Sequence, residues 1–410
     1  MSHLLDRPAD GIPPVAATPA AFQRAADRLA AGSGPFAIDT ERASAFRYDD
    51  RAFLLQIRRA GSGTVLLDPE GGRDALTTAL APVLNNQGWI MHAAPSDLPC
   101  LAWLGLYPSA IFDTELAARM AGFDHPNLGA MLEELFDVEL EKAYGDADWS
   151  ARPIPAHQLA YAALDVELLL ELGRKLADIL AEEGKLGWAN AEFAHIVDEH
   201  RSITAPPEPD WTSLRGIGSL RTPTQLAAAR ALWTHRDRQA RARDIAPGKI
   251  LANKALLEVA RSLPRSEEAL RRTRGFPRRR AGASQAWFTV LDTALRADPS
   301  TFPRPDRSLA PVPGKSTWSR DYPELWEVYQ DIRAEIDALA DDLVMQPETI
   351  IKTSAVRAAV WAALGEPRFS SDLAGTLSRA EDIPALLRDE DCRDWQIQLV
   401  TPILERALFR

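Results

Sequence analysis

The sequence predicts an α/β domain with a mixed sheet, followed by two all-α domains. Residues 1–203 alternate short β-rich runs with stretches of helical periodicity, which is the pattern of α/β proteins. Residues 214–296 and 322–410 show helical periodicity without β-rich runs. Proline-rich and polar stretches at 204–213 and 297–321 separate these parts and predict two linkers.

The strands of the first domain are predicted from short runs rich in β-branched, aromatic and other apolar residues. They lie at 36–41, 52–57, 64–67, 89–92 and 110–112. The turn Ala60-Gly-Ser-Gly63 predicts a hairpin between the second and third strands, so the sheet should contain antiparallel as well as parallel pairs. Apolar spacing predicts helices at 73–84, from about 127 to 140 and from about 155 to 183.

Composition excludes several classes of protein. Of the 410 residues 46% are hydrophobic, including 11 Trp and 13 Phe, which is too much apolar surface for a largely disordered chain. No apolar run approaches about 18 residues, so we expect no membrane span and no membrane partner. The first residues, Met1-Ser-His-Leu-Leu-Asp6, lack the pattern of a signal peptide. Cys100 and Cys392 form neither a zinc motif nor a disulfide framework, and a reducing cytoplasm is the expected location.

Charge is distributed unevenly along the chain. Residues 214–280 contain 15 Arg and 2 Lys against 5 acidic residues, a net charge of +12, whereas the rest of the chain carries −23. A strongly basic block in an acidic protein is typical of a module that binds a polyanion such as nucleic acid. The alternative is a solvated helical surface in an Arg-rich protein.

Two acidic residues stand at the end of the first predicted strand. Asp39 and Glu41 are two positions apart, so both side chains point to the same face. Two carboxylates this close repel each other, and burial increases the cost of ionising them. A divalent cation with oxygen ligands would relieve the repulsion. The pair is therefore a candidate metal site, with a solvated strand end as the alternative.

Three further residues could join that pair. Asp97 follows the strand at 89–92 and is expected to cap the start of a helix. Tyr161 and Asp165 are four residues apart on a helix and project from one face of it. A carboxylate beside an apolar stripe is costly unless it has a partner. The alternatives are a simple N-cap for Asp97 and a partly exposed helix face for the other two.

Together these segments resemble the ribonuclease D family of DEDD-type 3′→5′ exonucleases with a tyrosine in the third motif. The resemblance covers roughly residues 15–200 and rests on order and spacing. The segments are Phe36-Ala-Ile-Asp-Thr-Glu41, His92-Ala-Ala-Pro-Ser-Asp97, Phe112-Asp-Thr-Glu-Leu-Ala-Ala118, Asp148-Trp-Ser-Ala-Arg-Pro-Ile154 and Tyr161-Ala-Ala-Leu-Asp165-Val. The resemblance implies a ribonuclease H-like fold for the first domain.

The resemblance also implies a phosphodiester hydrolase that uses two divalent cations, Mg²⁺ or Mn²⁺. Asp39, Glu41 and Asp165 would hold the first ion directly. Asp39 would bridge to the second ion, and Asp97 would bind largely through water. Tyr161 would orient the attacking water. The products would be nucleoside 5′-monophosphates released from an RNA 3′ end.

The basic block resembles the helicase-and-RNase-D C-terminal (HRDC) domain, and residues 322–408 resemble a more divergent copy of it. Similar patterns at 245–250 and 344–350 suggest a degenerate duplication. We therefore expect RNA-binding residues in the basic block and one beside the catalytic acids. The candidates are Arg271, Arg272, Arg274, Arg278, Arg279 and Arg280 in the block and Arg152 near the acids.

The sequence thus predicts a metal-dependent 3′→5′ exoribonuclease that trims the 3′ ends of tRNA precursors or other structured RNA, with no stable protein partner. One alternative is a DNA 3′→5′ exonuclease, because metal chemistry does not distinguish the two sugars. Another is a catalytically inactive RNA-binding or scaffold protein, which the presence of all four acids disfavours.

Overall fold

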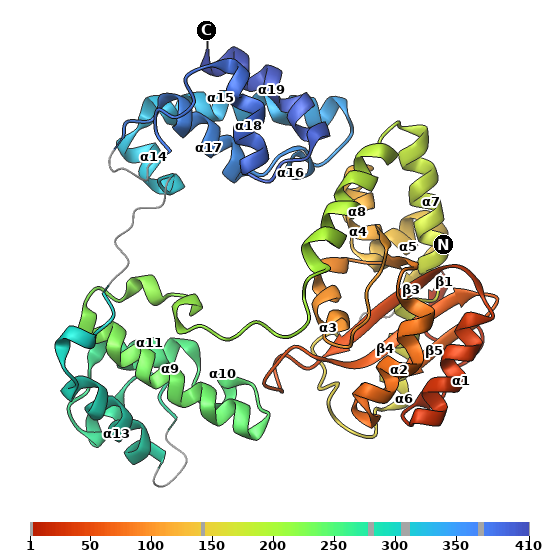
Figure 1. The fold of residues 1–410 in the computed structure, drawn as a ribbon, viewed down its shortest axis with the longest axis horizontal. Helices are drawn as coiled ribbons and strands as arrows, with labels where there is room; N and C mark the ends of the chain where they lie inside the picture. Colours follow the sequence, from red (N-terminus) through yellow and green to blue (C-terminus); the bar gives the residue numbers. More distant parts are fainter. Residues whose placement is uncertain (1–2, 141–143, 278–282, 305–311, 368–372, 410) are drawn as a thin grey trace.

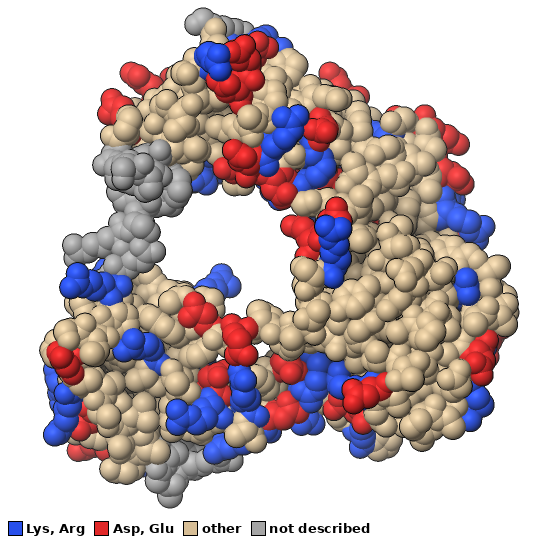
Figure 2. All heavy atoms as spheres, viewed as in Figure 1, with Lys and Arg blue, Asp and Glu red and all other residues tan. Residues whose placement is uncertain are grey.

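The chain folds into three lobes (Figure 1). The structure is a computed structural model that describes residues 3–140, 144–277, 283–304, 312–367 and 373–409. We call the lobes the α/β domain (residues 3–203), the basic domain (211–304) and the C-terminal domain (312–409). The lobes surround a central opening in the space-filling view (Figure 2).

The α/β domain is built on a mixed sheet, as the sequence predicts, and the sheet has a sixth strand, β2, that the sequence did not predict. Its strand order is β2-β5-β4-β3-β6-β7. The central pairs β3–β4 and β4–β5 are antiparallel, whereas β2–β5, β3–β6 and β6–β7 are parallel. The bounds are β2 Val15–Ala16, β3 Ser33–Arg42, β4 Ala52–Ala60, β5 Gly63–Leu67, β6 Gly88–Met91 and β7 Ala110–Asp113.

Helices pack against this sheet and fix the position of its carboxyl ends. α7 packs on β3 and β6, and α6 packs on β4 and β5. Gly173 of α7 allows the close approach, because a Cβ there would lie 3.0 Å from the Ile90 side chain of β6. The helices are α1 Pro19–Ala30, α2 Arg73–Leu84, α3 Leu98–Ala102, α4 Thr114–Met120, α5 Leu128–Phe136, α6 Ala156–Asp165, α7 Leu169–Glu182 and α8 Leu186–His200.

The predicted helix at 127–140 is too long. α5 ends at Phe136, because Asp137 adopts a left-handed conformation with φ 57°. Residues Val138–Leu140 then form strand β8, which pairs in parallel with β1, His3–Leu5. Apolar residues continue at helical spacing through this segment, but the left-handed backbone at Asp137 ends the helix and a strand follows.

The predicted helix at 155–183 is two helices. α6 ends at Asp165, and α7 begins at Leu169. Val166 is fully buried in the turn between them. The break places Asp165 at the end of a helix rather than in its middle.

The basic domain is a compact set of helices with its own apolar core. The helices are α9 Pro223–Arg243, α10 Pro247–Ile250, α11 Asn253–Ser262, α12 Glu267–Arg272 and α13 Ala283–Arg296. Trp211 of the short helix η3, Trp211–Ser213, packs against this core. The predicted linker at 204–213 is therefore too long at its C-terminal end.

The C-terminal domain is also all-α. It contains α14 Lys315–Asp321, α15 Pro323–Asp342, α16 Pro347–Ile350, α17 Thr353–Leu364, α18 Ile383–Asp389 and α19 Asp394–Leu408. Trp318 of α14 is fully buried in its core. The predicted linker at 297–321 is wrong in this part, since α14 belongs to the domain. A long helix, a four-residue helix and a further helix follow one another in both helical domains.

One apolar core runs through the α/β and C-terminal domains. Trp188 of α8 stacks on Trp395 of α19 with ring centroids 5.2 Å apart. The carboxylate of Glu192 accepts hydrogen bonds of 2.9 Å from Arg393 Nε and from Trp395 Nε1. The C-terminal domain is therefore docked through both apolar and charged contacts.

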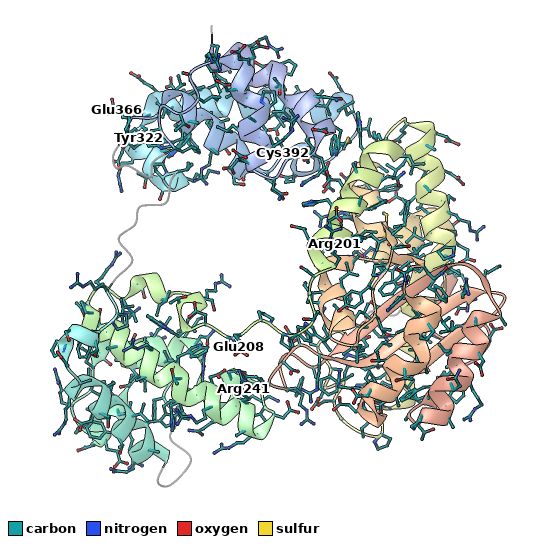
Figure 3. The ribbon with its side chains drawn as sticks, in the orientation of Figure 1. Arg201, Glu208, Arg241, Tyr322, Glu366 and Cys392 are labelled. Atoms are coloured by element: carbon teal, nitrogen blue, oxygen red, sulfur yellow. The ribbon has the colours of Figure 1, made fainter. Side chains whose placement is uncertain are left out.

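The basic domain is attached to the α/β domain through polar contacts. The Arg51 guanidinium donates to both carboxylate oxygens of Asp244, at 3.0 and 2.6 Å. The Tyr48 hydroxyl donates to Asp237 at 2.7 Å. In the connecting segment, Glu208 lies beside Arg241 of α9, with 3.3 Å between Oε2 and Nη2 (Figure 3).

No helix among the described residues is long and apolar enough to cross a membrane.

Candidate active site

Strand β3 carries two acidic residues out of the core to one end of the sheet. Residues 36–38 of this strand are at most 1% exposed, which fixes the strand rigidly between β4 and β6. Asp39 and Glu41 follow on the same face. Asp165, the last residue of α6, faces them, and carboxylate oxygens of the three residues lie within 4.8 Å of one another. The fold thus brings together residues 126 positions apart (39 and 165).

Asp97 lies next to this group but is held differently from the prediction. It precedes α3, yet its side chain caps no backbone N–H of that helix. Instead its Oδ1 accepts a 2.5 Å hydrogen bond from the Thr40 hydroxyl. The Arg42 Nε lies 3.7 Å from the same oxygen. The predicted capping role is wrong, because a side chain from the neighbouring strand takes the carboxylate.

The four acids line one pocket of about 240 Å³ (the acid pocket). Its other lining residues are Thr40, Arg42, His92, Leu128, Tyr161 and Leu169. A larger pocket of about 700 Å³ shares Leu128, Tyr161 and Asp165 with it. The larger pocket adds Tyr144 and the loop at 145–147. The acids therefore stand at the end of an open groove into which a chain could extend.

Burial and mutual repulsion raise the pKa values of these carboxyl groups. Burial is the main cause for Asp39 and Glu41, followed by the charges of the neighbouring acids, and both pKa values are well above the usual range. Burial and then the charge of Asp97 raise the pKa of Asp165 to about 8. The Glu41 Oε1 atom is buried without a hydrogen-bond partner among the described residues. Without a cation, the site is electrostatically unfavourable.

Tyr161 stands one helical turn before Asp165 and also lines the acid pocket. Its ring lies edge-on to Tyr144, with centroids 6.0 Å apart, and 6.3 Å from the buried Trp149. Burial, and then the charges of Asp165, Glu41 and Asp39, raise the pKa of Tyr161 above its usual 10. The hydroxyl is therefore protonated at neutral pH and can donate a hydrogen bond.

Three residues at the site, Thr40, Arg42 and Tyr144, were not singled out from the sequence. Thr40 and Arg42 lie within or directly after the Asp-Thr-Glu segment, so their neighbourhood was a signal, but their contact with Asp97 depends on the fold. Tyr144 had no sequence signal. His92 hydrogen-bonds through Nδ1 to Thr114 Oγ1 at 2.9 Å, and burial lowers its pKa to about 4.

Arg152 does not match the predicted RNA-binding role. Its Nε and Nη2 bind the two carboxylate oxygens of Asp68 at 2.6 and 2.7 Å. Its remaining N–H groups donate to three backbone carbonyls, those of Trp149, Ala151 and Phe53. All five N–H groups of the guanidinium therefore have acceptors within the protein, and the side chain fixes the loop that carries Trp149.

The structure places part of the predicted basic cluster on the surface. Arg271, Arg272 and Arg274 are exposed, and Arg272 pairs with Glu268 at 3.2 Å. Arg278, Arg279 and Arg280 lie outside the described residues. Phe276 and Trp287 are 4% exposed and belong to the core of the basic domain, so neither can stack on a base.

Three family models match successive parts of the chain. A 3′-5′ exonuclease model matches residues 15–181, an HRDC domain model matches residues 225–284, and a 3′ to 5′ exonuclease C-terminal domain model matches residues 311–408. The three matched ranges follow the order of the three lobes, and the last range includes α14.

Solved structures of similar shape include a protein from Bifidobacterium adolescentis. It is 31% identical, covers 100% of both chains and superposes with a TM-score of 0.85. The structure of Escherichia coli RNase D covers 92% of this chain and 99% of its own, with 24% identity and a TM-score of 0.65. This second likeness supports the fold, a ribonuclease H-like exonuclease domain followed by helical domains.

Curated relatives of this chain include ribonuclease D proteins from several bacteria. Ribonuclease D of Gluconacetobacter diazotrophicus is 34% identical over 213 residues, or 51% of this chain and 53% of that protein. The chain thus aligns with about half the length of that relative. Ribonuclease D of Acidiphilium cryptum is 31% identical over 292 residues, or 70% of this chain and 71% of that protein. With this coverage and the matching domain order, the chain belongs to the ribonuclease D family.

Proposed function

We propose that this protein is a metal-dependent 3′→5′ exoribonuclease that releases nucleoside 5′-monophosphates. The observation that carries the proposal is the group of three carboxylates, Asp39, Glu41 and Asp165, within 4.8 Å of one another in a pocket that continues into a groove. Membership of the ribonuclease D family supports the same chemistry.

The residues present fit divalent cations. The donor set consists of carboxylate oxygens, which Mg²⁺ and Mn²⁺ prefer. The unpartnered Glu41 Oε1 and the raised pKa values indicate that Arg42, the one cation lining the described part of the pocket, compensates the charge of the acids only in part. Asp39, Glu41 and Asp165 would hold one ion, and Asp39 would be shared with a second. Asp97, held by Thr40 beside the group, would act through water.

Divalent cations held by these acids would supply activation of a water and stabilisation of the leaving 3′ oxygen of a phosphodiester. The protein itself supplies rigid placement and water orientation. Tyr161, protonated and next to Asp165, can donate a hydrogen bond that aligns the attacking water. Thr40 directs Asp97 at the pocket, and its hydrogen bond opposes the rise in the pKa of Asp97 that burial causes.

The basic domain would hold the RNA body. Lys and Arg side chains occur at several places on the visible face of this lobe rather than in one patch (Figure 2). Such a distribution suits contacts to a phosphate backbone without base readout. We infer that structured RNA such as a tRNA precursor is held there while its single-stranded 3′ end enters the groove. The Escherichia coli neighbour is described as an exoribonuclease involved in structured RNA processing, which is consistent with this choice.

The decisive experiment is degradation of 5′-labelled single-stranded RNA, and of DNA of equal sequence, with Mg²⁺, Mn²⁺ or EDTA. We expect stepwise shortening of RNA from the 3′ end with metal and none with EDTA. Asp39→Asn should lower the rate by about 10²–10³-fold, because it weakens a ligand shared by both ions. The matched control is Asp178→Asn, at an exposed position of α7. Equal activity of wild type and Asp39→Asn would contradict the metal assignment, and a preference for DNA would favour the alternative substrate.

A second prediction concerns the tyrosine hydroxyl. Tyr161→Phe keeps the ring beside Trp149 and removes only the oxygen, so kcat should fall by roughly 10²-fold with little change in KM. Tyr144→Phe is the control, because Tyr144 lines the adjoining pocket and contacts Tyr161 through its ring. If both variants keep the wild-type kcat, Tyr161 has only a packing role.

A third prediction concerns pH and metal removal. The pKa of Asp165 is raised from 3.8 to about 8 in the folded protein. An acid with a raised pKa favours folding at low pH, and this contribution is lost as pH rises through the folded pKa. In EDTA, Asp165→Asn should therefore raise Tm relative to wild type by an amount that grows from about pH 5 to about pH 8.

Added Mn²⁺ should reverse this difference, because binding to the folded state stabilises wild type. Thermal unfolding across this pH range, with and without the metal, measures both effects. A pH-independent difference between the two proteins in EDTA would contradict the raised pKa that burial and the charge of Asp97 give Asp165.

A fourth prediction concerns the basic domain. The combined changes Arg271→Ala, Arg272→Ala and Arg274→Ala should weaken RNA binding equally for unrelated sequences and flatten its salt dependence. Each lost phosphate contact on a single strand should change the log–log slope by roughly 0.7. Arg24→Ala with Arg174→Ala, on exposed faces of α1 and α7, is the control. Superimposed salt curves for the triple variant and wild type would mean that RNA is held elsewhere.

A further inference from the structure

One cation lines the acid pocket, and its side chain is not used by the fold. Arg42 follows Glu41 at the end of β3 and is the one arginine or lysine among the described residues that line this pocket. Its guanidinium forms no hydrogen bond with any described residue. Its one ion pair is long, with 3.7 Å between Nε and Asp97 Oδ1, and its side chain is 31% exposed.

The neighbouring arginines of the α/β domain differ in this respect. Each has short hydrogen bonds that hold it in the structure: Arg47 to Ser150, Arg51 to Asp49 and Asp244, Arg58 to Thr64 and Glu167, and Arg152 to Asp68. The protein therefore occupies at least one N–H group of each of these guanidinium groups. The N–H groups of Arg42 can be reached by a molecule in the pocket.

Its position also limits what it can do. Thr40 and Arg42 are two residues apart on β3, and both face Asp97. Thr40 makes the short hydrogen bond and keeps the carboxylate in place. Arg42 is therefore not needed to position Asp97, and its loss leaves that carboxylate with its closer partner.

An RNA substrate would need a positively charged side chain in the acid pocket. An RNA 3′ end brings phosphates, each with a negative charge, to a pocket lined by four carboxylates. Two divalent cations would carry four positive charges and only balance those carboxylates. A guanidinium adds a positive charge beyond this balance, and its planar fork matches the oxygens of a phosphate.

We propose that Arg42 is a substrate-positioning residue that binds a backbone phosphate of the RNA 3′ end in the acid pocket, and that it pairs loosely with Asp97 when RNA is absent. The proposal rests on the exonuclease function proposed above. Substrate binding within the pocket would then depend on a residue of β3, the strand that carries Asp39 and Glu41, in addition to the basic domain.

The test uses the full-length protein and a trinucleotide RNA, which is too short to extend far from the pocket. Arg42→Gln keeps the length of the side chain and removes the charge. We expect KM for the trinucleotide to rise about 10-fold or more, as for a lost charge-assisted hydrogen bond, with kcat changed less than about 3-fold. The KM of Arg42→Lys should lie between those of wild type and Arg42→Gln, because lysine keeps the positive charge but lacks the planar guanidinium. Arg174→Gln, which removes one charge from an exposed position of α7, should keep the wild-type KM.

Calorimetric titration with Mn²⁺, without RNA, separates positioning of the substrate from ordering of the acids. Removing a nearby positive charge should leave the Mn²⁺ affinity of Arg42→Gln unchanged or higher. An unchanged KM in Arg42→Gln, with active wild type, would overturn the inference while leaving the proposed function intact. A fall in Mn²⁺ affinity parallel to the rise in KM would also overturn it, because Arg42 would then only order the metal ligands. An inactive wild type would instead contradict the proposed function.

Discussion

Mutual repulsion between carboxylates at the end of β3 is the constraint on which the site depends. A chain would ordinarily separate such groups or expose them to water. Here the fully buried residues of β3 and the packing of α6 and α7 hold Asp39, Glu41 and Asp165 together. The free energy of burying the apolar sheet is large enough to hold an electrostatically unfavourable group at its edge. The raised pKa values are the sign of that conflict, and a bound cation would relieve it.

The parts of the site set by local geometry were predictable from the sequence. Alternation along a strand places Asp39 and Glu41 on one face, and helical spacing does the same for Tyr161 and Asp165. The parts set by distant partners were not. Asp97 was expected to cap α3, but Thr40, 57 residues away in sequence, binds its carboxylate. Arg152 was expected to face RNA, but Asp68, 84 residues away, binds its guanidinium.

The domain order was also predictable, but its boundaries were not. Proline content suggested linkers at 204–213 and 297–321, whereas Trp211 and Trp318 within them pack against the cores of the helical domains. A single large apolar side chain outweighs the local composition, because burying it contributes several times the free energy of a backbone preference. In the same way, the left-handed Asp137 ended a helix that apolar spacing alone extended to residue 140.

The apolar core shared by the first and last lobes has a consequence for how the chain is organised. The chain leaves this core after α8, forms the basic domain with a separate core, and returns to the first core at α14. The basic domain is therefore an insertion between the two segments of the sequence that share the first core. The core shared by the two ends of the sequence is complete only after the C-terminal helices have been synthesised, whereas the core residues of the basic domain lie close together in the chain. The basic domain could therefore be exchanged or lost in evolution without removing residues from that core, and β3 would keep the packing that supports it.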